Sequence, residues 1–121
     1  MRRSPLAALT AGLLIAGLTG CGSTTTVRSG QTLRVALTEY RVTPQDVDVP
    51  AGLVTISVHN YGRLSHDLVI SQGSVTEAST QPIAPGQTTD LVAVLSPGTY
   101  QMASTVLADQ ALGAYGTLTV G

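Results

Sequence analysis

Residues 54–60 read Val-Thr-Ile-Ser-Val-His-Asn, an alternation of apolar and polar side chains with a period of two. That period places Val54, Ile56 and Val58 on one face of a β-strand and the polar side chains on the other face. Residues 33–37, Leu-Arg-Val-Ala-Leu, and the apolar residues at 91, 93 and 95 follow the same rule. We therefore expect an all-β protein.

Short runs rich in β-branched and aliphatic residues continue along the chain, and none of them has a helical period. The expected strands cover residues 33–40, 47–49, 54–60, 66–71, 88–95, 99–103 and 117–120. Proline, glycine and asparagine separate several of them, at residues 50–52, 60–62, 85–86 and 97–98. This spacing predicts a small domain of about seven or eight strands, built as two antiparallel sheets packed face to face.

The first 21 residues have the layout of an export signal. Two arginines follow Met1, residues 6–18 are apolar and uncharged, and residues 18–21 read Leu-Thr-Gly-Cys, which resembles a bacterial lipobox. We interpret residues 1–20 as a signal peptide, Cys21 as a lipidated N-terminus, residues 21–30 as a flexible tether and residues 31–121 as one domain. The alternative is an ordinary signal peptide with a cysteine by chance. Both interpretations place the protein outside the cytoplasm.

Composition limits what the mature domain can use. Cys21 is the only cysteine, so a lipid on its sulfur excludes a disulfide, and a chain without Phe or Trp needs an aliphatic core. Residues 21–121 contain four arginines, no lysine and seven acidic residues, a side-chain charge of about −3. Without a basic cluster we expect no nucleic-acid partner.

Five segments, in order, resemble the small cupredoxins, the plastocyanin- and azurin-type domains. They are residues 47–52, 54–62, 66–70, 83–89 and 97–120. The set is most similar to cupredoxin-like domains of bacterial envelope lipoproteins. The resemblance implies a Greek-key, two-sheet β-sandwich.

Cupredoxins of this type bind copper through a histidine on one strand and a cysteine, a histidine and a methionine on the loop between the last two strands. The resemblance places His66 at the first position and Ser104, Asp109 and Ala114 at the other three. Serine and aspartate oxygens are hard donors and alanine has none, whereas a type 1 copper centre needs a thiolate. We therefore expect a degenerate copper site with no cofactor.

Several interpretations of these residues stay open. His66 can pair with Asp109 or Ser104 by hydrogen bonds, or His66 and Asp109 can form a weak metal site with Ser104 or water. A hydrolase triad is not expected, because converging ligand positions put Ser104 and Asp109 at the same edge of the His66 ring. By strand parity Met102 fills the core and His59 points outward.

The loops around this site suggest a binding surface. Tyr61 and Arg63 precede His66, Tyr115 follows Ala114, and Asp67 resembles the residue that braces the ligand loop in the family. We predict a non-enzymatic, lipid-anchored module of the cell envelope that binds a protein or a small ligand at this loop end. The alternative is a protein that handles copper or another metal, or transfers electrons, through atypical ligands around His66.

Overall fold

The structure, a computed structural model, describes residues 23–107 and 109–121, so the predicted signal peptide and Cys21 lie outside the described residues. The described residues form ten strands and no helix. The strands are β1 (Thr25–Thr26), β2 (Thr32–Thr38), β3 (Arg41–Thr43), β4 (Asp46–Val49), β5 (Gly52–Asn60), β6 (Val69–Gln72), β7 (Val75–Ser79), β8 (Thr88–Leu95), β9 (Gly98–Ala103) and β10 (Tyr115–Val120). Accordingly, this part of the chain contains no helix that could cross a membrane.

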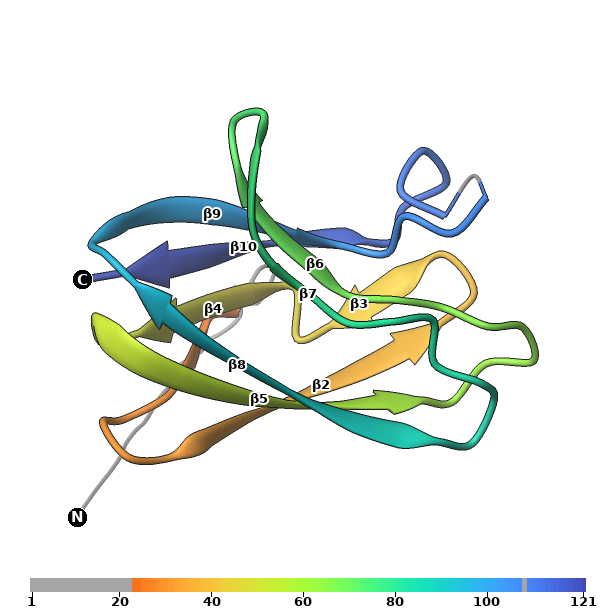
Figure 1. The fold of residues 1–121 in the computed structure, drawn as a ribbon, viewed down its shortest axis with the longest axis horizontal. Coiled ribbons are helices and arrows are strands. Elements are labelled where there is room, and N and C mark those ends of the chain that lie inside the picture. The colour runs from red at the N-terminus through yellow and green to blue at the C-terminus, as the bar shows by residue number, and fades with distance from the viewer. Residues whose placement is uncertain (1–22, 108) are drawn as a thin grey trace, which may run out of the picture.

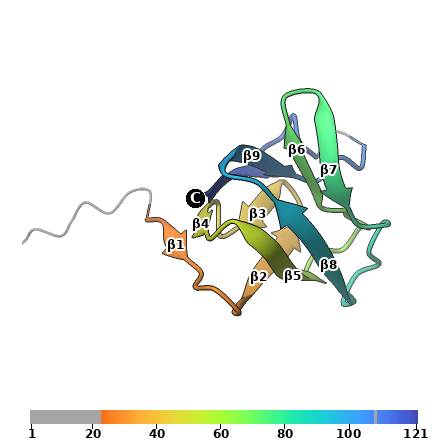
Figure 2. The same cartoon turned by 60° about the vertical axis from the view of Figure 1, so that its left-hand side comes forward.

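The strands form two layers, seen one above the other in Figure 1 and turned by 60° in Figure 2. One sheet has six strands in the order β1-β4-β10-β9-β6-β7, and the other has four in the order β3-β2-β5-β8. This confirms the predicted all-β, two-sheet sandwich. The strand count exceeds the prediction because β1, β3 and β7 are short or exposed and carry no apolar alternation that a sequence pattern can detect.

The prediction of purely antiparallel sheets was wrong. β2 pairs with β5 in parallel, and β4 pairs in parallel with both β1 and β10. The cause is the excursion between β2 and β5: β3 folds back on β2, and β4 then crosses to the other sheet. The chain consequently re-enters the four-stranded sheet running in the direction of β2, as a crossover connection requires.

The core lies between the two sheets and is almost entirely aliphatic. The inward residues of β2 and β5, among them Leu37, Ile56 and Val58, are fully buried, as their period predicts. Met102 of β9 is also fully buried and fills the core, as predicted. Tyr100 is the one aromatic residue of this core among the described residues, and its hydroxyl donates a hydrogen bond to the carbonyl of Ser96 over 2.7 Å.

Part of the segment that we interpreted as a flexible tether pairs with the six-stranded sheet. Thr25 and Thr26 run parallel to Val47 and Asp48, and the amide of Val27 donates to the carbonyl of Asp48 over 2.9 Å. Val27 is the only aliphatic residue between Cys21 and Gly30. Its burial against the sandwich removes apolar surface from water and so stabilises the pairing of this segment with β4.

Candidate functional site

His66, Ser104, Asp109 and Ala114 come together at one end of the sandwich, where the loop between β9 and β10 meets the loop between β5 and β6. His66 is fully buried and forms an isolated bridge with Ile83 just before β6. Ser104 follows β9, and its amide donates to the carbonyl of Ala114 over 2.9 Å, directly before β10. The amide of Ala114 donates in turn to the carbonyl of Asp109 over 2.9 Å. The four positions therefore form one cluster.

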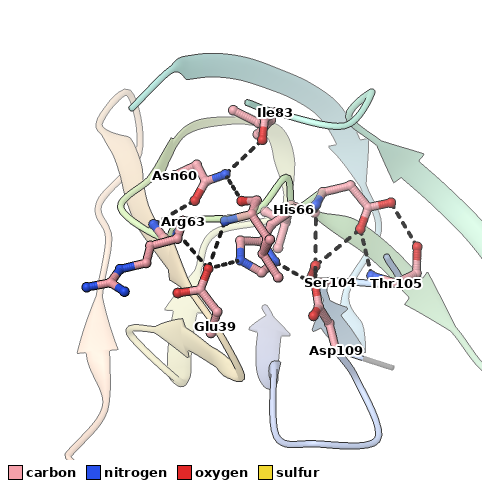
Figure 3. A network of polar contacts seen from close by, with 12 residues as sticks. Glu39, Asn60, Arg63, His66, Ile83, Ser104, Thr105 and Asp109 are labelled. Atoms are coloured by element: carbon pink, nitrogen blue, oxygen red, sulfur yellow. Dashed lines mark hydrogen bonds and ion pairs between the residues drawn. The ribbon is translucent and has the colours of Figure 1, made fainter. Parts of the chain in front are cut away.

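Carboxylates hold the His66 ring at both nitrogens, as Figure 3 shows. Nδ1 lies 2.6 Å from Oδ2 of Asp109, and Nε2 lies 3.1 Å from Oε1 of Glu39. The hydroxyl of Ser104 donates to the same Oδ2 of Asp109 over 2.7 Å. Asp109 therefore lies between serine and histidine, whereas a hydrolase triad places the histidine between the other two residues.

This environment favours the charged form of His66. Burial alone lowers the pKa of the imidazole, but the hydrogen bonds and negative charges of Asp109 and Glu39 outweigh it and raise the pKa above its ordinary value of 6.5. Ionised carboxylates only accept hydrogen bonds, so contact with two of them is satisfied when both ring nitrogens carry protons. The cluster thus resembles an ion triad in which His66 and Asp109 are buried and Glu39 is partly exposed.

Glu39 was missed in the sequence, although its position carried a signal. Its Oε1 accepts hydrogen bonds from the amides of Leu64 at 3.0 Å and Arg63 at 2.6 Å, as well as from His66. These donors, the two backbone amides first, lower the pKa of Glu39 from 4.5 to about 2. Glu39 continues the inward parity of the buried residues of β2, which marks a carboxylate directed toward the interior.

Asn60 was also missed in the sequence, although its position carried the same parity signal. It ends β5 on the inward parity and is fully buried. Its amide nitrogen donates to the carbonyls of Leu64 and Ile83, each over 2.8 Å, and its oxygen accepts from the amide of Gly62 over 2.8 Å. Asn60 therefore fixes the loop that carries the Glu39 contacts.

Asp67 links the start of β6 to the β9–β10 loop. Its Oδ1 accepts from the amide of Thr105 over 2.6 Å, and its Oδ2 accepts from the Thr105 hydroxyl over 2.8 Å. Its own amide donates to the hydroxyl of Ser104 over 3.3 Å. These contacts are those of a residue that braces the loop.

Tyr61, Arg63 and Tyr115 do not form one patch around His66. Tyr61 lines a hollow on the outer face of the four-stranded sheet, whereas Tyr115 lines a different hollow beside the β9–β10 loop. Arg63 is exposed and contributes its amide, not its guanidinium, to the Glu39 contact. His59, as its parity predicts, lies on the outer face, where its Nδ1 is 2.6 Å from Oγ1 of Thr88.

The clustered residues do not fit a type 1 copper ion. Such an ion needs a thiolate and two imidazoles, usually with a thioether, and the cluster offers one imidazole whose nitrogens are both bonded to carboxylates. Ser104 and Asp109 supply hard oxygens, and Ala114 supplies no donor. Within residues 23–107 and 109–121, no three or more His, Cys, Asp or Glu side chains are arranged to hold a metal ion.

Solved structures share the fold at low sequence identity. Auracyanin from Roseiflexus castenholzii is 22% identical with a TM-score of 0.69, and the match covers 83% of this chain and 99% of that chain. Rusticyanin from Thiobacillus ferrooxidans is 22% identical with a TM-score of 0.62, covering 85% and 86%. An azurin from Methylomonas sp. strain J is 14% identical with a TM-score of 0.67, covering 77% and 99%. A search of curated protein sequences gave no significant match.

The sequence itself carries the family assignment. The family model for the cupredoxin-like domain matches residues 10–120, which is nearly the whole chain. The ordered segments, the two-sheet sandwich and this match agree. The chain belongs to the cupredoxin-like domain family.

Proposed function

We propose that the protein is a non-enzymatic, lipid-anchored binding module of the cell envelope that has lost the type 1 copper site of its family. One observation carries this proposal: Nδ1 of His66 is bonded to Oδ2 of Asp109, a residue at a former ligand position, over 2.6 Å. Ser104 and Ala114 occupy the neighbouring positions of the former ligand set. Hydrogen bonds thus take the place that metal bonds have in a copper centre.

The His66 cluster supports a structural role at the loop end. A buried imidazole without partners is costly, and here Asp109 and Glu39 satisfy both of its nitrogens. Asp109 belongs to the β9–β10 loop, and Glu39 follows β2 and binds the loop after β5. The His66–Asp109 bond therefore joins the two segments that a copper ion would otherwise join, and Glu39 adds the end of β2 to them.

Membrane attachment rests on the sequence. Residues 18–21 fit a lipobox, and the acyl chains of a diacylglycerol thioether on Cys21 give stable anchoring, since each buried methylene contributes about 0.8 kcal/mol. Four residue steps separate Cys21 from Thr25, where β1 begins, and four fully extended steps span roughly 14 Å. The domain is thus held close to the membrane surface, outside the cytoplasm.

The loop end offers an apolar surface for a protein partner. Four exposed apolar side chains lie in or beside the two loops that the His66–Asp109 bond joins: Leu64, Leu107, Leu112 and Tyr115. Leu107 is 89% exposed and has a φ of 53°, a left-handed conformation that is unfavourable for leucine. Exposed apolar groups held in strained loops are typical of contact sites. We infer a partner with an apolar contact surface.

Photo-crosslinking tests this surface. A photoreactive residue introduced at Leu112 of the full chain, expressed in its host envelope, should give a discrete crosslinked partner. The same residue at Val75, which is exposed on the β6–β7 hairpin, should not. Equal labelling from both positions, or none from Leu112, would contradict a partner at the loop end.

Copper titration separates this function from the alternative of metal handling or electron transfer. That alternative has support because one similar solved structure, auracyanin A, is described as a "blue" copper protein. We expect the full chain to bind no copper stoichiometrically and to remain colourless. Tight stoichiometric binding that His66→Ala abolishes would reject the loss of the copper site and favour ligation by His66 with Asp109.

A further inference from the structure

A hollow of about 650 Å³ lies on the outer face of the four-stranded sheet, away from the His66 cluster. Strands β2, β5 and β8 supply most of its lining, and Tyr61 extends it past the end of β5. The residues that shape it are Arg34, Ser57, His59, Tyr61, Thr88 and Asp90. None of them takes part in the contacts of the loop-end cluster described above.

The strand register gives the hollow two opposed walls. Arg34 of β2 is the pairing partner of Ser57 of β5, which pairs in turn with Asp90 of β8, so the three residues form one row across the sheet. The two charged residues are two strand spacings apart, roughly 9–10 Å. In the described part of the chain neither forms an ion pair. The small side chain of Ser57 forms the floor of the hollow between two walls. Arg34 forms the wall that donates hydrogen bonds, and Asp90 forms the wall that accepts them.

An aromatic ring lies beside this row, in the strand direction: Tyr61 follows Ser57 by four residues, just past the end of β5, which is roughly 13 Å along an extended chain. Tyr61 is 68% exposed, yet its amide donates to the carbonyl of Leu37 over 2.8 Å, and its ring centroid lies 4.1 Å from that of His59. His59 is itself held by Thr88, 2.6 Å from its Nδ1. The ring of Tyr61 is therefore both accessible and braced, which limits the entropy lost when a ligand packs on it.

We propose that this hollow binds a neutral oligosaccharide, with one sugar ring packed on Tyr61 and the hydroxyl groups of a neighbouring sugar unit bonded to Arg34 and Asp90. A guanidinium only donates hydrogen bonds and an ionised carboxylate only accepts them, whereas a hydroxyl does both. A ligand with a single charge is attracted by one wall and repelled by the other, and an apolar ligand would displace water from both charged groups without replacing its hydrogen bonds. A braced aromatic ring beside a few polar groups is typical of small-molecule sites.

The test uses the full chain, solubilised in a detergent that carries no sugar. Chitotetraose and maltotetraose are added as probes, and binding is followed by ligand-observed NMR and by tyrosine fluorescence, which no Trp obscures. At least one probe should bind, and Arg34→Ala, Asp90→Ala and Tyr61→Ala should each weaken binding by about tenfold or more. Arg41→Ala and Tyr40→Ala are matched controls, since both residues are exposed and neither lines the hollow, and they should leave the affinity unchanged.

Ser57→Leu adds a direct test, because a large side chain on the floor should abolish binding. If that variant does not fold, the three exposed-side-chain variants still decide the matter. Failure of both probes to bind at millimolar concentration, or equal losses in the controls, would overturn the proposal. A concentration-dependent dimer in sedimentation, disrupted by Arg34→Ala and without saccharide binding, would instead assign this face to a second copy. None of these outcomes depends on copper or on the loop-end partner.

Discussion

Gly62 and Glu39 approach so closely that a Cβ atom on Gly62 would lie 2.5 Å from Oε1 of the carboxylate. The same atom would lie 2.9 Å from Nε2 of His66. Gly62→Ala should therefore displace the contact between Glu39 and His66 and lower the free energy of unfolding by about 1–3 kcal/mol. Urea unfolding measures the loss. Gly121→Ala, at a position with open space around it, should have little effect, and equal stability of both variants would contradict the geometry.

Asn60→Ala should be among the more damaging substitutions of a single polar residue. It removes a buried hydrogen bond to the carbonyl of Ile83 and part-buried ones to the carbonyl of Leu64 and the amide of Gly62, and an unsatisfied buried group costs about 1–3 kcal/mol. We expect a loss of about 2–4 kcal/mol in urea unfolding. Gln81→Ala, at an exposed position, is the control. A loss no larger than that of the control would show that Asn60 does not hold the loop.

The contribution of Glu39 to the free energy of unfolding should depend on pH in the acid range. Its pKa is about 2 in the folded protein and 4.5 as its ordinary value, so its contribution is present above pH 4.5 and is lost as the pH falls from 4.5 through 2. Glu39→Gln should destabilise the protein at neutral pH and flatten the acid limb of a plot of unfolding free energy against pH. Glu77→Gln, on the exposed strand β7, should retain that limb.

The contribution of His66 to the free energy of unfolding should change with pH in the opposite direction, above its ordinary pKa. Because its folded pKa is raised above 6.5, its contribution is fully present below pH 6.5 and is lost as the pH rises through the folded pKa. Over that interval stability should fall by up to about 1.4 kcal/mol per pH unit. His66→Gln should remove the slope while His59→Gln retains it. A wild-type curve that is flat above pH 6.5 would mean that the folded protein does not favour the protonated ring.

Restoring the family's donors tests the assignment of positions. The triple variant Ser104→Cys, Asp109→His and Ala114→Met returns a thiolate, a second imidazole and a thioether to residues that already cluster around His66. We expect it to bind copper and to become intensely blue, measured by visible absorption and metal analysis. The same variant with His66→Ala should stay colourless. A folded but colourless triple variant would refute the assignment of the ligand positions.

The fold was well predicted wherever the alternation of apolar and polar residues extended over enough of a strand to be recognised. Leu37, Ile56 and Met102 are buried because alternation fixes the face of each strand. The parallel pairing of β2 with β5 was not predictable. A two-residue period in the sequence indicates which face of a strand is buried, but it does not indicate which strand lies alongside or in which direction that strand runs. The short strands β1 and β3 offered too few residues for any period.

The candidate site was predicted in part. His66, Ser104, Asp109 and Ala114 are brought together in the structure, but Glu39 and Asn60 were overlooked, although the expected strands at residues 33–40 and 54–60 contain them. The inward parity that runs through Leu37 reaches Glu39, and the one that runs through Val58 reaches Asn60. Tyr61 and Tyr115 line separate hollows because Tyr61 follows β5 of the four-stranded sheet and Tyr115 begins β10 of the six-stranded sheet, a separation that no local sequence pattern reveals.

The place of β10 in the six-stranded sheet has a consequence for how the molecule is made. β10 lies between β4 and β9, so both of these neighbours need residues 115–120 to complete their ladders. A ribosome-bound chain that lacks this segment leaves β4 and β9 unjoined, with the core open between them. The domain therefore reaches its native state only after Tyr115–Val120 has been synthesised, because the six-stranded sheet is otherwise interrupted at its centre.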